Sequence, residues 1–74
     1  MSRLPILKSR ELVRVLRELG FKAIRQRGSH LFFAHPDGRT TLVLIHGSED
    51  IGRGLLKQIL REIKISSDEF IKFL

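Results

Sequence analysis

The first part of the chain carries apolar residues at the spacing of one helical face. They recur at positions i, i+3, i+4 and i+7, as Leu12, Val15, Leu16 and Leu19. Ser9 stands where a helix N-cap is favoured, and Gly20 supplies the left-handed residue that often ends a helix. Phe21 is then positioned to fold back on Leu16. The pattern predicts an amphipathic helix from about residue 9 to residue 20, preceded by an extended arm over residues 1–8.

The next part of the chain is rich in β-branched and aromatic residues and contains two turn signals. The first signal is Gly28-Ser29. The second is Pro36-Asp37-Gly38, in which proline presets one backbone angle and glycine accepts a positive φ. We expect strands over residues 21–27, 30–35 and 39–46, the last two forming an antiparallel hairpin. Phe32 and Phe33 then point to opposite faces, so that one belongs to the core and the other is free to stack a base or contact a partner.

Two further helices are predicted after a connection of glycine, serine and acidic residues. The first begins near Gly54 and has the apolar stripe Leu56, Ile59, Leu60 and Ile63. Ser66 and Glu69 match a capping box, and Ile65 and Phe70 match a hydrophobic staple, so a short last helix starts there. The order α-β-β-β-α-α predicts an α+β fold, with helices on one face of a small three-stranded antiparallel sheet. Because the chain has 74 residues, we expect a single domain over residues 1–74.

Positive charge is concentrated in the first part of this sequence. Residues 1–48 contain nine Lys/Arg and three Asp/Glu, whereas residues 49–74 contain five of each, which together make the net charge of +6. Such clustering attracts polyanions, although solvated charge kept for solubility is the alternative explanation. The absence of cysteine excludes disulfides and thiolate metal sites, and no apolar run approaches the roughly 20 residues that span a bilayer. We expect a soluble cytoplasmic protein with no membrane association.

Several kinds of catalytic site lack support in the sequence. There is no phosphate-binding glycine loop, no zinc-ligand spacing and no nucleophile elbow, and the eight acidic residues do not form a two-metal pattern. We therefore expect no metal and no small-molecule cofactor. Any chemistry falls to histidine and to the basic residues.

His30 has the most suggestive setting of the three histidines, because it follows the Gly28-Ser29 turn and the cations Arg25 and Arg27. RNA carries its own nucleophile, the 2′-hydroxyl, so cleavage needs a base, cationic stabilisation of the phosphorane and a proton for the leaving oxygen. His30 together with basic residues could supply these. The alternative is a half-buried strand histidine that is hydrogen-bonded to the backbone.

The remaining candidate residues are assigned from their positions along the strands. We expect Lys22, Arg25 and Arg27, with the turn residues Gly28 and Ser29, to bind RNA, mainly through its phosphates. The helix arginines Arg10, Arg14 and Arg17 are further candidates. His35 is most simply a turn residue, whereas His46 is either a core-edge residue or a second proton-transfer group.

Five segments together resemble the HicA, or YcfA-like, toxin family. They are residues 20–21, 25–30, 35–39, 46–47 and 54–60, and they occur in the family's order over nearly the whole chain. The chain departs from the family pattern at Leu44, where a proline is common, and at Leu55, where a small polar residue is common.

The resemblance implies a fold similar to double-stranded-RNA-binding domains and an mRNA-cleaving activity with one catalytic histidine, which matches His30. It also implies a HicB-type antitoxin that holds the toxin inactive, most simply by covering His30. The expected function is thus a metal-independent endoribonuclease toxin. A non-catalytic RNA-binding module is the alternative, because similar folds bind RNA without cutting it.

Overall fold

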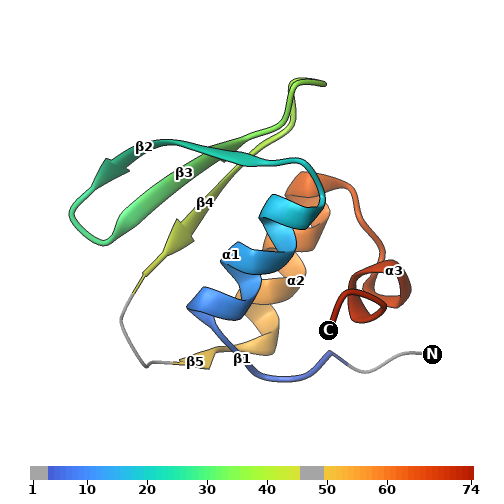
Figure 1. Cartoon of the computed structure of the whole chain (residues 1–74). Coiled ribbons are helices and arrows are strands. Elements are labelled where there is room, and N and C mark those ends of the chain that lie inside the picture. The colour runs from blue at the N-terminus through green and yellow to red at the C-terminus, as the bar shows by residue number, and fades with distance from the viewer. Residues whose placement is uncertain (1–3, 46–49) are drawn as a thin grey trace.

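A three-stranded antiparallel sheet and three helices make up most of the structure (Figure 1), a computed structural model that describes residues 4–45 and 50–74. The helices are α1 (Ser9–Glu18), α2 (Arg53–Ile63) and α3 (Ser67–Ile71), and the sheet strands are β2 (Lys22–Arg27), β3 (His30–Ala34) and β4 (Thr40–Leu44). The predicted α+β class and three-stranded antiparallel sheet are confirmed, and so is the α-β-β-β-α-α succession apart from two additional short strands.

A second, two-stranded sheet was not expected. β1 (Leu7–Lys8) pairs antiparallel with β5 (Asp50–Ile51), and a 2.7 Å ion pair joins Lys8 to Asp50 across it. This pairing holds part of the predicted extended arm against the chain that enters α2 (Figure 1). The pairing also explains why the predicted N-cap of α1 was wrong by one residue. Lys8, not Ser9, is the N-cap, and Ser9 is the first helical residue and only 2% exposed.

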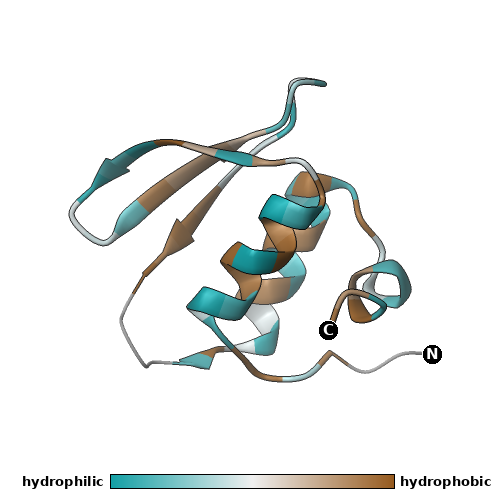
Figure 2. Ribbon diagram, in the orientation of Figure 1, coloured by the Kyte–Doolittle hydropathy of each residue, from teal (hydrophilic) through white to brown (hydrophobic). Residues whose placement is uncertain are grey.

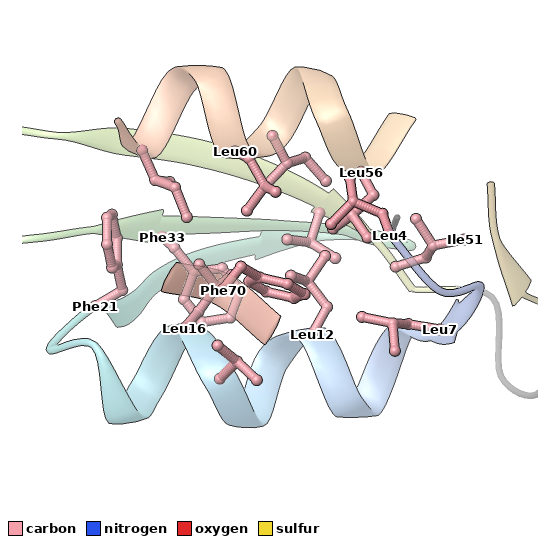
Figure 3. Packing of buried hydrophobic residues seen from close by; sticks show 14 residues of the cluster. Leu4, Leu7, Leu12, Leu16, Phe21, Phe33, Ile51, Leu56, Leu60 and Phe70 are labelled. Carbon is pink, nitrogen blue, oxygen red and sulfur yellow. The ribbon is translucent and has the colours of Figure 1, made fainter. Parts of the chain in front are cut away.

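The hydrophobic core lies between the helices and one face of the sheet. Figure 3 shows Leu12 and Leu16 of α1 facing Leu56 and Leu60 of α2, with Phe33 of β3 in the same cluster. Each such side chain, when fully buried, contributes roughly 1.5–3 kcal/mol. Figure 2 shows the corresponding pattern, in which hydrophobic residues run along β3 and β4 while hydrophilic residues occupy both ends of β2.

Local signals place most of the helix ends and turns. Gly20 has φ +100°, and the Phe21 amide donates to the Leu16 carbonyl at 2.9 Å, which confirms the predicted stop of α1. Gly38 has φ +99° and its amide donates to the His35 carbonyl, so the tight β3–β4 hairpin is also confirmed.

The last two helices differ from expectation in detail. α2 begins at Arg53 after the N-cap Gly52, slightly before the predicted start near Gly54. Ser66 caps α3 by accepting the Glu69 amide at 3.1 Å, as predicted. In a full capping box the Glu69 carboxylate would accept a hydrogen bond from the backbone amide of Ser66. Here it accepts a 3.3 Å hydrogen bond from the Ser66 hydroxyl instead, so only half of the capping box forms.

No helix within residues 4–45 and 50–74 combines the length and the apolar character that crossing a membrane requires.

Candidate active site

The helices leave one face of the sheet uncovered except along its β4 edge, where α2 lies, and we call this face the open face. Phe33, Thr41 and Val43 are buried and so define the covered face. The antiparallel register then assigns the alternate residues to the open face. These are Lys22, Arg25 and Arg27 of β2, His30, Phe32 and Ala34 of β3, and Thr40, Leu42 and Leu44 of β4.

A β-bulge in β2 brings the three cations to this face. Successive residues of a regular strand point to opposite faces of the sheet, so in a straight strand Lys22 would point away from Arg25 and Arg27. The register shifts between Ala23 and Arg25, which leaves Ile24 as the extra residue. Ile24 is 64% exposed. The bulge therefore aligns all three predicted RNA-binding cations on the side of the sheet that carries His30.

His30 is the first residue of β3 and is exposed. Gly28 has φ +57° in the preceding turn, and a Cβ there would meet nothing within 4 Å, so the turn is open to solvent. The Ser29 carbonyl accepts the Ile45 amide at 2.7 Å, which ties this turn to the end of β4. The imidazole forms no hydrogen bond with the residues that the structure describes, and its exposure differs from the half-buried position of the alternative.

The cations beside His30 are available for an anion. Arg27 lies directly opposite His30 in the ladder, and Arg25 lies opposite Phe32 with its guanidinium carbon 5.6 Å from the ring centroid. Lys22, Arg25 and Arg27 are exposed, and none of them forms an ion pair within the described part of the chain. Phe32 is only half-buried, so Phe33 alone is the core phenylalanine of this pair.

A groove between β4 and α2 reaches the imidazole. It has a volume of about 300 Å³, and we call it the His30 groove. It is lined by His30, Leu42, Leu44, Leu55, Gln58, Ile59 and Glu62. Sequence reasoning missed this feature, because it assigned Ile59 to the apolar stripe of the helix and gave Leu55, Gln58 and Glu62 no part in the site. Leu55, an exposed leucine beside the helix's apolar stripe, was the available signal.

The other histidine in the described residues has a structural role. The His35 imidazole packs edge-on against the Phe21 ring, with centroids 5.1 Å apart, and its Nδ1 accepts the Asp37 amide at 3.1 Å. Arg39 bonds the Asp37 carboxylate and lies over the Phe21 ring, which fixes the same corner. His35 is thus a turn residue, as predicted, whereas His46 lies outside the described residues.

The helix arginines belong to a different surface. α1 packs on the covered side of the sheet, and Arg14 is engaged by Glu18 and by the Phe73 carbonyl, which it bonds at 3.1 Å. No group of three metal-ligating side chains occurs within residues 4–45 and 50–74.

The site and fold define a small α+β domain that presents an exposed histidine on an open sheet face, among cations that form no ion pair with the described residues. The model of a known family, the HicA toxin of bacterial toxin–antitoxin systems, matches residues 9–65. This match covers most of the chain, which therefore belongs to the HicA toxin family. Comparison with curated proteins finds no match.

Proposed function

We propose that this toxin is an mRNA-cleaving endoribonuclease in which His30 transfers the proton. HicA toxins are generally ribonucleases, and a toxin of this kind would act on mRNA in the cytoplasm. The observation that carries the proposal is the placement of His30 itself. Its exposed imidazole lies opposite Arg27, on the same face as Arg25 and Lys22, at the mouth of a groove.

The chemistry follows from what these groups can do. The His30 imidazole takes the proton of the ribose 2′-hydroxyl, and the 2′-oxygen forms a bond to phosphorus. The bond from phosphorus to the 5′-oxygen breaks, and the proton returns from the imidazole to that oxygen, directly or through water. Arg25 and Arg27 stabilise the charge that develops on the phosphorane. The products are a 2′,3′-cyclic phosphate and a 5′-hydroxyl, and no water is consumed.

The turn and the first strand support substrate binding. Lys22, Arg25 and Arg27 offer phosphate contacts along β2. Gly28 and Ser29 bring exposed or half-buried backbone next to His30, where a phosphate oxygen can approach the turn. These contacts read phosphate and carry no base specificity.

The proposal is tested by replacing His30. Folded His30→Ala protein should cleave RNA about 10² to 10⁴-fold more slowly than wild type, and free imidazole should restore part of the rate. Arg61→Ala, an exposed change on α2 outside the site, is the matched control and should leave cleavage unchanged. Wild-type cleavage by His30→Ala would overturn the catalytic assignment. RNA binding without cleavage by the wild-type protein would favour the alternative, a non-catalytic RNA-binding module.

Cleavage is proposed to proceed without a metal ion. Because the 2′-hydroxyl is the nucleophile and arginines supply the positive charge, cleavage should persist in excess chelator and yield 2′,3′-cyclic phosphate ends. Loss of activity in chelator, restored by Mg²⁺ and accompanied by 3′-hydroxyl ends, would contradict the proposed mechanism.

The antitoxin partner that the family implies is proposed to be of the HicB type and to act by covering the open face around His30. A basic, partly apolar surface suits both a polyanion and an acidic protein with apolar contacts.

A further inference from the structure

The His30 groove combines apolar walls with a few polar groups. Leu42, Leu44, Leu55 and Ile59 supply aliphatic surface, whereas Gln58 and Glu62 of α2 supply polar atoms across from His30. Leu55 is 39% exposed, so part of this apolar surface faces solvent. A volume of about 300 Å³ lies at the lower limit of ligand pockets, which range over roughly 300–1,000 Å³, and suits one flat ring system.

The two polar residues of α2 differ in what they offer. The Glu62 carboxylate accepts a 2.8 Å hydrogen bond from the Thr41 hydroxyl, which holds it at the groove. An ionised carboxylate only accepts hydrogen bonds, so it favours a ligand edge that donates. The Gln58 side chain forms no hydrogen bond with the described residues and can both donate and accept.

The groove is continuous with features that suit a nucleic-acid strand. At one end stand His30 and the cations of the open face. At the other end the groove shares Leu42 and Glu62 with a wider hollow of about 620 Å³ that extends to Lys64. A single strand can therefore pass from the cations across His30 toward Lys64. This continuity favours a nucleotide over an isolated apolar side chain as the occupant.

We propose that the His30 groove seats the base of the nucleotide whose 2′-hydroxyl attacks, and that Gln58 and Glu62 select bases with an exocyclic amino group. This inference rests on the ribonuclease function proposed above. Adenine, cytosine and guanine each present an amino donor, whereas uracil presents two carbonyl oxygens around one N–H. The single N–H of uracil lies between its two carbonyl oxygens, which the Glu62 carboxylate repels, so uridine is the disfavoured nucleotide.

Binding is measured with His30→Ala protein and the four nucleoside 3′-monophosphates, by following the methyl NMR signals of Leu44 and Leu55. The amino-bearing nucleotides should shift these signals and bind roughly 5- to 150-fold more tightly than uridine 3′-monophosphate. Glu62→Gln keeps an acceptor for Thr41 and adds a donor, so it should remove most of this preference. Gln58→Ala should weaken the binding of all four nucleotides. Lys57→Ala, a neighbouring exposed change, should alter the binding of none of them.

Cleavage of matched oligonucleotides separates this inference from the function on which it rests. Wild-type protein should cut after adenosine, cytidine or guanosine in preference to uridine, and Glu62→Gln should cut after uridine as well. If cleavage requires His30 but the four bases are cut and bound equally, base selection fails while the ribonuclease function stands. If the wild-type protein does not cleave RNA, the proposed ribonuclease function is rejected, and the NMR titration still tests whether the groove binds a base. Loss of antitoxin binding in Gln58→Ala and Glu62→Gln, with unchanged base preference, would assign the groove to the protein partner and overturn the proposal.

Discussion

Arg27 and His30 face each other across the β2–β3 ladder, at the end where Gly28 and Ser29 turn the chain. Directly opposed residues have Cβ atoms about 4.5–5.5 Å apart, so the guanidinium and the imidazole share one small area of the open face. Arg25 occupies the next place along this face, over the Phe32 ring. A phosphate bound between the two arginines would therefore lie beside the proposed proton-transfer group.

Removing these arginines should change the salt dependence of RNA binding. With His30→Ala as the background, so that RNA stays intact, Arg25→Ala plus Arg27→Ala should reduce the slope of log K against log salt by about 0.7 per lost contact. Arg10→Ala plus Arg17→Ala removes the same charge from α1 and should leave the slope unchanged, because α1 packs on the covered side of the sheet. Equal slopes for both double variants would reject the open face as the RNA footprint.

The bulge in β2 should tolerate a deletion within the strand. Deleting Ile24 removes the extra residue, so that Lys22, Arg25 and Arg27 keep their places on the open face, and folding and RNA affinity should be retained. Deleting Gln26 instead moves Arg25 to the covered face and should weaken RNA binding. Circular dichroism and RNA titration of the two deletion variants provide the measurement. Greater loss of RNA binding on deletion of Ile24 than of Gln26 would be inconsistent with this register.

Gly20 should resist substitution for two separate reasons. Its φ is +100°, and a Cβ there would lie 2.9 Å from Nε2 of His35. Gly20→Ala should lower the free energy of unfolding by about 1–3 kcal/mol, measured by urea denaturation. In a double-mutant cycle, His35→Ala should relieve the steric part of this cost but leave the part due to φ. Strict additivity would show that the imidazole is not the obstacle.

The β3–β4 corner should be sensitive to acid. The hydrogen bond from the Arg39 side chain holds the pKa of Asp37 below its ordinary value of 3.8. A carboxyl whose pKa is lower in the folded state stabilises the protein above its unfolded pKa, and this contribution is lost as pH falls through the folded pKa. Asp37→Asn should therefore be less stable than wild type at neutral pH, and the difference should shrink as pH falls below 3.8. A difference that does not change across this range in urea titrations would contradict the ion-pair explanation.

Antitoxin and RNA should compete for the open face. Titrating a HicB-type antitoxin into His30→Ala toxin that holds labelled RNA should release RNA in proportion to antitoxin bound, because the proposal assigns both partners to one surface. A stable ternary complex with RNA still seated at His30 would instead require inhibition from a distant site.

Short-range patterns were sufficient for the parts of this molecule that depend on neighbouring residues. Gly20 ends α1, the Pro36-Asp37-Gly38 turn closes the β3–β4 hairpin and Ser66 caps α3, because each feature depends on hydrogen bonds or backbone angles within a few positions. The order of elements followed from hydrophobic periodicity for the same reason. Local patterns and the family resemblance also drew attention to His30 and the cations of β2.

Contacts between distant segments decided the rest. Ser9 lost the N-cap role because Leu7 and Lys8 pair with a strand more than forty residues further along the chain. Lys22 joins Arg25 and Arg27 only through a bulge whose position depends on pairing with β3. The His30 groove requires β4 and α2 to lie side by side, which no local pattern encodes. Strand register and helix docking depend on the packing of the whole core, and the arrangement of the candidate site depends on both.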